Sequence, residues 1–257
     1  MAARELYDAK EWFTALRKAA QNDPTMPKGR SEASHKDGWG TAAFTQNRLI
    51  FYKSPSCIWN DCMANVIAEN LKPPMAVVAH ARKASKGMPL GVGAAHPFAL
   101  HLRSGEILFV AQNGGVNIEK TQELCKKKPG DNNVDSFVYS VALAEIVEEK
   151  GLKDALTELH RELENREAIR HMANTASLLV EKRESSWSFE LGVVRHVLDE
   201  TLLEYGELYW LRDDNLFAVA SSTLARLLGD RFKMKPMERN EVIVVKAEDL
   251  SYECSPL

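Results

Sequence analysis

The chain has 257 residues, of which 45% are apolar and 27% charged, so it is long enough for a packed core and a solvated surface. Its formal net charge of -3 comes from interleaved acidic and basic residues, which argues against nucleic acid or an anionic membrane as a partner. No apolar run approaches the ~18 residues of a membrane span, and residues 1–10 do not resemble a signal peptide. We therefore expect a cytoplasmic protein.

The four cysteines do not suggest a structural framework. Cys57, Cys62, Cys125 and Cys254 form no paired CxxC set, and a chain of this length can build its core without disulfides. No second pair or neighbouring histidine completes a four-ligand zinc site around Cys57 and Cys62. We expect no metal site and no cofactor.

Hydrophobic periodicity predicts the elements of the first half. Trp12, Phe13 and Leu16 recur at helical spacing, so a helix is expected over residues 7–22, ending at Asp23-Pro24. Further along, the pattern predicts strands at 39–45 and 48–53 joined by a Gln46-Asn47 hairpin turn, a helix at 57–71, and a buried strand at 75–80.

The second half begins with a loop over residues 83–93, which is expected to be flexible because it carries three glycines and a proline. After it, the pattern predicts strands at 97–102 and 106–111, helices at 134–150 and 152–164, and strands at 177–181, 187–194, 207–211, 216–220 and 241–245. Strands, then helices, then strands are typical of a layered α+β fold. Without an internal repeat or a linker, residues 1–257 are expected to form a single domain.

Three short segments place polar residues or glycines where a predicted strand ends or a helix begins: His80-Ala81-Arg82, Gln112-Asn113-Gly114-Gly115 and Asn133-Val134-Asp135-Ser136. Each has an ordinary explanation, namely a surface arginine, a turn and a helix N-cap. Each also has a chemical one. Arg82 suits a carboxylate, Asn113 and the Gly114 N–H suit an oxyanion, and Asp135 suits an ammonium.

The order of the motifs decides between these explanations. Asp37-Gly38-Trp39-Gly40, His80-Ala81-Arg82, His96-Pro97-Phe98, Asn113-Gly114 and Asp135-Ser136 follow one another at spacings that resemble the class II glutamine amidotransferases, cysteine members of the N-terminal-nucleophile hydrolases. The resemblance covers residues 34–140 and continues more weakly to 220–221. It implies a four-layer αββα sandwich that hydrolyses glutamine to glutamate and ammonia through a cysteinyl acyl-enzyme.

The resemblance also assigns roles to individual residues. Arg82 corresponds to the arginine that holds the α-carboxylate of glutamine, and Asp135 to the acid that binds its α-ammonium. The Asn113 side chain and the Gly114 N–H correspond to the two oxyanion donors, and the loop 83–93 to the segment that closes on substrate. His80 and His96 are expected to support the site from behind.

The sequence departs from the family pattern at the nucleophile, an N-terminal cysteine that starts the first core strand. Here Met1 is followed by Ala2 and the predicted helix, so both the cysteine and its strand are expected to be missing. Either a short strand led by cysteine precedes Met1, or the protein is a non-catalytic glutamine-binding or interaction module. In the catalytic case, either a protein partner or an unrecognised pocket of this chain is expected to handle the ammonia acceptor. Gln112 also departs from the pattern, standing where the family usually has His.

Overall fold

The computed structural model describes residues 1–257 except 5–6, 28–31, 47, 127–133, 183–186 and 247. Asn47 of the expected hairpin turn and Asn133 of the third segment therefore lie outside the described residues. The helices are α1 (Ala9–Gln21), α2 (Met63–Asn70), α3 (Ile118–Gln122), α4 (Asp135–Lys150), α5 (Leu152–Asn165) and α6 (Ser222–Leu228), with 3-10 turns η1 (Ile58–Asn60), η2 (Glu200–Leu202) and η3 (Asp230–Phe232).

The strands form two antiparallel sheets. The first is seven-stranded, in the order β11 (Lys235–Pro236), β9 (Leu208–Arg212), β10 (Leu216–Ser221), β1 (Ala2–Ala3), β4 (Met75–Ala81), β2 (Trp39–Thr45) and β3 (Arg48–Ser54). The second is six-stranded, in the order β13 (Tyr252–Pro256), β12 (Glu241–Lys246), β8 (Trp187–Arg195), β7 (Ile169–Lys182), β6 (Ile107–Val116) and β5 (Phe98–His101).

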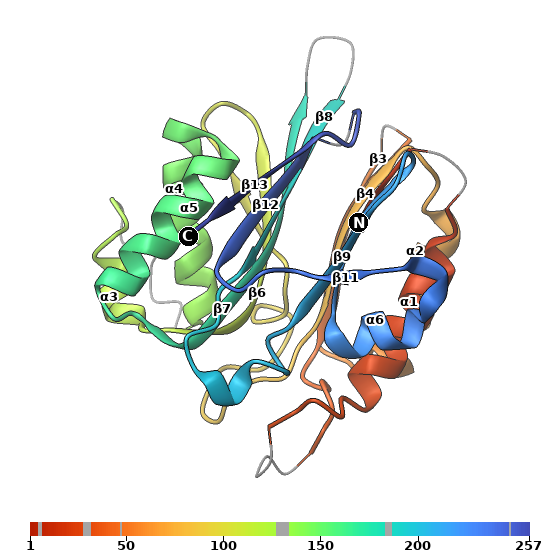
Figure 1. Cartoon of the computed structure of the whole chain (residues 1–257), viewed down its shortest axis with the longest axis horizontal. Helices are drawn as coiled ribbons and strands as arrows, with labels where there is room; N and C mark the ends of the chain where they lie inside the picture. Colours follow the sequence, from red (N-terminus) through yellow and green to blue (C-terminus); the bar gives the residue numbers. More distant parts are fainter. Residues whose placement is uncertain (5–6, 28–31, 47, 127–133, 183–186, 247) are drawn as a thin grey trace.

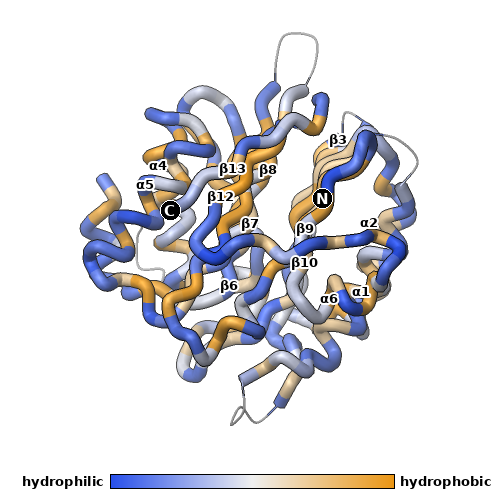
Figure 2. The backbone as a smooth tube through the Cα atoms, viewed as in Figure 1, coloured by the Kyte–Doolittle hydropathy of each residue, from blue (hydrophilic) through white to orange (hydrophobic). Residues whose placement is uncertain are grey.

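The sheets pack face to face between two layers of helices, which confirms the predicted four-layer sandwich. Helices α3, α4 and α5 cover the outer face of the six-stranded sheet, and α1, α2 and α6 cover that of the seven-stranded sheet (Figure 1). Successive apolar side chains of a strand point to opposite faces of its sheet. One core therefore lies between the sheets and another lies under each helix layer (Figure 2). No helix in the described parts of the chain is long and apolar enough to cross a membrane.

A strand does precede α1, so the expectation that this strand is missing was wrong. Ala2 and Ala3 form β1 in the middle of the seven-stranded sheet, paired with β4 on one side and β10 on the other. A strand of two residues is too short to show any periodicity, and only its long-range partners define it.

Two other boundaries differ from prediction. Strand β6 does not end at Ala111 but continues through Asn113 and Gly114 to Val116, because β7 pairs with it over this whole length. The predicted helix at 57–71 is divided into η1 and α2, and Cys57 and Cys62 occupy the N-cap positions of the two.

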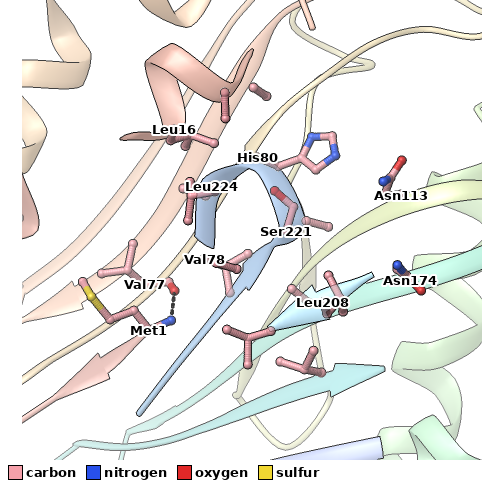
Figure 3. A pocket seen from close by; sticks show the side chains of 18 of the residues that line it. Met1, Leu16, Val77, Val78, His80, Asn113, Asn174, Leu208, Ser221 and Leu224 are labelled. Atoms are coloured by element: carbon pink, nitrogen blue, oxygen red, sulfur yellow. Dashed lines mark hydrogen bonds between the residues drawn. The ribbon is translucent and has the colours of Figure 1, made fainter. Parts of the chain in front are cut away.

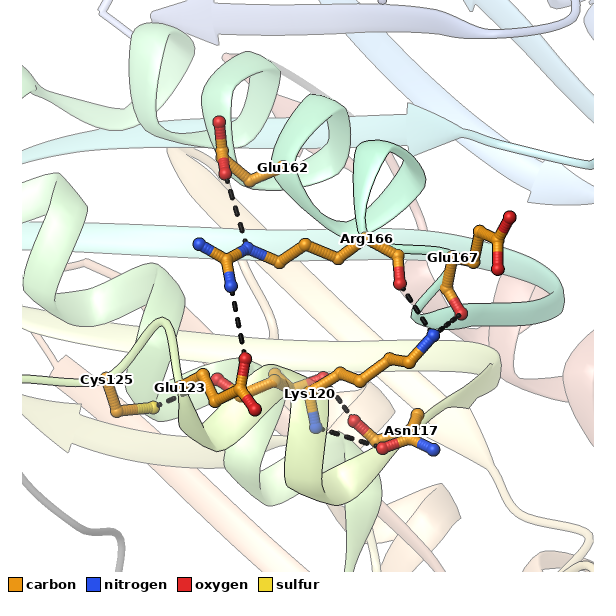
Figure 4. Close-up of polar contacts among 8 residues, drawn as sticks. Asn117, Lys120, Glu123, Cys125, Glu162, Arg166 and Glu167 are labelled. Carbon is orange, nitrogen blue, oxygen red and sulfur yellow. Dashed lines mark hydrogen bonds and ion pairs between the residues drawn. The ribbon is translucent and has the colours of Figure 1, made fainter.

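The end of α5 is tied to α3 by a polar cluster on the outer helix layer (Figure 4). Lys120 Nζ donates to the backbone carbonyls of Arg166 and Glu167, at 2.8 and 3.3 Å, just beyond the last turn of α5. A cation at this position is favourable because the carbonyls that end a helix carry partial negative charge. The cluster fixes the entry to β7, which runs alongside β6.

Candidate active site

Arg82 directly follows strand β4, at the edge of the sheets. The strand is a buried apolar run, and the backbone beyond its end is fixed by hydrogen bonds from the Arg82 N–H to the Gly38 carbonyl (2.8 Å) and from the Asp37 N–H to the Arg82 carbonyl (2.9 Å). Arg82 is 5% exposed, and its Nη1 donates to the carbonyl of Pro89 in the following loop at 3.0 Å. Burial lowers the pKa of its guanidinium, an effect that Asp37 and Asp135 oppose.

Strand β6 holds Asn113 and Gly114 beside β7. Asn113 pairs with Asn174, and the register shifts between Gly114 and Val116. Gly114 has a φ of +131°, and a Cβ there would lie 1.9 Å from the Met172 carbonyl oxygen, so only glycine fits. The Asn113 side-chain amide makes no hydrogen bond to another described residue, which leaves it available to a ligand.

Helix α4 begins with Asp135, and its carboxylate turns toward β6. One carboxylate oxygen accepts from the Ser136 N–H at 2.8 Å and the other from the Val116 N–H at 3.3 Å. Burial raises the pKa of this carboxyl, while the two N–H donors and the charges of Arg170 and Arg82 act in the opposite direction. The group is thus a half-buried acid next to two backbone donors.

His80 and His96 lie against each other, with ring centroids 4.5 Å apart. His96 Nδ1 accepts from the Gln112 N–H at 3.4 Å, which assigns its proton to Nε2, 2.8 Å from Ser136 Oγ. Burial and neighbouring positive charges lower both pKa values, that of His80 to about 3, so both rings are neutral at pH 7. His80 Nδ1 and the side-chain amide nitrogen and oxygen of Gln112 are buried and have no hydrogen-bond partner among the described residues.

The structure brings all the predicted site residues together. A cavity of about 40 Å³ is lined by His80, Arg82, His96, Asn113, Gly114 and Asp135. Its wall also includes residues to which the sequence assigned no individual role in the site: His35, Lys83, Ser85, Met88, Gln112, Ser136 and Tyr205. The cavity therefore contains a guanidinium, a carboxylate, a side-chain amide and a glycine N–H. These groups match the charges and the polar side chain of a free amino acid.

A second cavity, of about 240 Å³, adjoins the first and shares His35, His80, Asn113 and Tyr205 with it. It reaches from α1 and α6 through the seven-stranded sheet, between β4 and β10, to β7 and β8 of the six-stranded sheet. Figure 3 shows Met1 at one end of this larger cavity and Asn113 and Asn174 at the other. The Met1 α-amine donates to the Val77 carbonyl at 2.9 Å, and burial lowers its pKa to about 5. Most of the remaining wall is apolar.

The four cysteines of the chain lie away from the two cavities. Neither cavity is lined by any of the chain's four cysteines, and all four are unpaired. Within the described ranges, no three His, Cys, Asp or Glu side chains gather as a metal-binding group.

Comparison with known proteins identifies the family. A family model for class II glutamine amidotransferases matches residues 23–185, and the chain belongs to that family. The fold is similar to that of a solved allosteric regulatory enzyme of purine biosynthesis (TM-score 0.60, 19% identity, 95% of this chain and 46% of that one). It is also similar to glutamine phosphoribosylpyrophosphate amidotransferase from B. subtilis (TM-score 0.59, 17% identity, 98% and 47%). The chain thus spans about half the length of these structures, and a comparison with curated proteins finds no match.

Proposed function

We propose that this chain is a glutaminase of the amidotransferase type, which hydrolyses glutamine to glutamate and ammonia through a cysteinyl acyl-enzyme. The observation that carries the proposal is the single cavity shared by Arg82, Asn113, Gly114 and Asp135. A protein partner would handle the ammonia acceptor. Residues 1–257 would act as one domain in this reaction.

The charges of the cavity match the two ends of a free amino acid. Arg82 would receive the α-carboxylate in a bidentate fork, exchanging its present bond to the Pro89 carbonyl for a charged partner. Asp135 would receive the α-ammonium. With both ends fixed, the side-chain carbonyl of glutamine would meet the Asn113 amide and the Gly114 N–H, which would stabilise the tetrahedral oxyanion.

The nucleophile would come from the slot between β4 and β10. Ala2 pairs with Ala76 and with Phe217, so the register places Met1 opposite Val77 and Ala218. An extended segment continuous with Met1 would pair its next three residues with Val78, Ala79 and His80 on β4, and would span about 10 Å. On β10 the third of these residues would lie opposite Ser221, which Figure 3 shows beside His80.

Strand alternation fixes where that third residue points. Ala3 packs under the helices and Ala2 packs between the sheets, so Met1 and the positions before it continue this alternation. The third residue before Met1 would turn its side chain between the sheets, toward Asn113. A cysteine at this position, with its free α-amine, would supply both the nucleophile and its base.

Glutamine binding tests the site independently of the nucleophile. Arg82→Ala should raise the Kd for glutamate, measured by titration calorimetry, by more than about tenfold, because it leaves a buried carboxylate unpaired. Arg103→Ala is the matched control, since Arg103 is an exposed arginine paired with Glu148 on the surface. An unchanged affinity in Arg82→Ala would refute the assignment.

Turnover separates the enzyme from the non-catalytic binder. A chain with Cys three residues before Met1 should release ammonia from glutamine, and one with Cys two residues before Met1 should not, because its side chain would face the helices. If the protein binds glutamine but no register gives turnover, it is a glutamine-binding module.

A further inference from the structure

A buried carboxylate and an imidazole lie where the two cavities meet, outside the set of residues that the family resemblance assigns. We propose that His35, oriented by Asp23, is a catalytic base that activates water for hydrolysis of the acyl-enzyme. This inference rests on the proposed function, which it deepens by adding a proton acceptor to the same site.

Asp23 is built to stay ionised. It follows the end of α1 and is 7% exposed, and one carboxylate oxygen accepts from the Thr25 N–H (3.1 Å), Thr25 Oγ1 (2.7 Å) and Thr223 Oγ1 (2.6 Å). The other oxygen lies 3.0 Å from His35 Nε2. Burial alone would raise the pKa of Asp23, but these hydrogen bonds outweigh it and lower the pKa to about 2.

His35 is held by its backbone as well as by its ring. Its N–H donates to the Ala20 carbonyl at 2.7 Å, so the loop residue is fixed against α1. The imidazole lies parallel to the Tyr205 ring, with an interplanar angle of 10°, and its side chain is 15% exposed. It lines both cavities, as Asn113 does. The ring is therefore fixed in position and accessible from the site.

The carboxylate of Asp23 fixes the tautomer of the neutral ring. The neutral ring donates from Nε2 to Asp23, which leaves Nδ1 as the acceptor nitrogen. No described residue forms a hydrogen bond with Nδ1. An imidazole that is oriented by a buried carboxylate and has its other nitrogen open is the arrangement of a general base.

His35 would accept a proton from the attacking water and return it at the end of the same step. A water oxygen attacks the carbonyl carbon of the thioester while its proton passes to His35 Nδ1, and Asp23 stabilises the resulting imidazolium. When the tetrahedral intermediate collapses, the C–S bond breaks and glutamate is released. The departing thiolate then takes the proton back from Nδ1, so the enzyme returns to its starting state.

Several charged or titratable groups contact His35 or line the smaller cavity with it. They come from the loop after α1, from β4 and the loop after it, from α4, and from the segment before β9: Asp23, His80, Arg82, Lys83, His96, Asp135 and Tyr205. His80 stays neutral near pH 7, because burial and the neighbouring His35 and Arg82 lower its pKa to about 3. It therefore does not compete as a proton acceptor at this pH.

A purely structural role is the competing explanation, since Asp23 also links the loop to α6 through Thr223. Nitrogen-15 NMR of histidine-labelled protein separates the two without any substitution. On addition of glutamate, the His35 Nδ1 resonance should move while Nε2 stays protonated. If glutamate binds and neither nitrogen responds, the inference is overturned while the proposed function stands. If glutamate does not bind at all, the proposed function fails first.

The second measurement is the rate of ammonia release from glutamine, in the chain that carries Cys three residues before Met1. His35→Asn should lower kcat by about 100-fold or more and leave the Kd for glutamate within twofold. His171→Asn is the matched control, because His171 forms a histidine–aspartate pair with Asp199 on the surface, outside both cavities. A melting temperature that falls in His35→Asn with kcat unchanged would show a structural role and overturn the inference.

Discussion

In protein whose chain begins at Met1, the buried α-amine of this residue should make the stability of the fold depend on pH. Its pKa is lowered from 8.0 to about 5 in the folded protein, where it is buried against the Val77 carbonyl. Between pH 5 and pH 8 the amine is protonated in the unfolded chain and neutral in the folded one. The unfolded state therefore binds more protons in this window, and the free energy of unfolding must rise with pH.

The magnitude follows from the shift. A difference of three pKa units corresponds to about 4 kcal/mol, at 1.36 kcal/mol per unit, gained between pH 5 and pH 8. Urea unfolding at several pH values measures it, on protein shown by mass spectrometry to retain Met1. An Nα-acetylated form is the control, because its amide N–H can donate to Val77 without carrying a charge.

The comparison of the two forms isolates the amine from the other groups. Buried histidines such as His80 and His160 also affect stability as pH falls, but both forms contain them. The acetylated protein should be the more stable form at pH 5, and the difference should shrink toward pH 8. Parallel pH curves for the two forms would show that Met1 is not buried as described, and the register of the slot would lose its support.

Two further predictions concern residues that shape the site. The pKa of Asp23 falls from 3.8 to about 2 on folding, so its carboxylate should add about 2 kcal/mol to the free energy of unfolding above pH 4, and this contribution should be lost toward pH 2. Asp23→Asn should therefore weaken the loss of stability between pH 4 and pH 2, measured by urea unfolding. An unchanged loss would contradict the hydrogen bonds that we describe around Asp23. Gly114→Ala should cost more than about 3 kcal/mol of unfolding free energy, because its Cβ would meet the Met172 carbonyl. Gly105→Ala, where φ is +95° but nothing lies within 4 Å, should cost only about 1 kcal/mol, and equal losses would contradict the steric argument.

The regular elements of the fold were predictable where a local pattern matched the burial. The periodic helices α1, α4 and α5 and the largely apolar strands β2 and β4 lie close to their predicted bounds. Elements that depend on pairing with distant parts of the chain were not predictable in this way. The Asn113-Gly114 pair indicates a turn by its local chemistry, yet pairing with β7 keeps it inside a strand, because long-range ladders override turn propensity.

The residues of the candidate site were likewise predictable only where a motif in the sequence indicated them. Arg82, Asn113 and Asp135 were predicted from the order of the motifs, and they line one cavity. Asp23 and His35 were missed, since Asp23-Pro24 indicates only the end of a helix, and nothing local links it to a histidine twelve residues later. The available signal was the position of His35, two residues before Asp37-Gly38-Trp39-Gly40, in a segment that the resemblance already covered.

The difference in polarity between the two cavities explains why they should have different occupants. A free amino acid carries two charges, and only the smaller cavity offers Arg82 and Asp135 to pair with them. The larger cavity is also lined by Asp23 and His35, but most of its wall consists of apolar side chains such as Val78, Leu208 and Val219. A charged ligand along this apolar wall would lose its hydration without compensation. An extended peptide segment avoids that cost, because its N–H and C=O groups would pair with β4 and β10 while its side chains met apolar walls. The residue directly before Met1, whose side chain would face the six-stranded sheet, should therefore be apolar. A charged residue at this position should lower the melting temperature and abolish turnover.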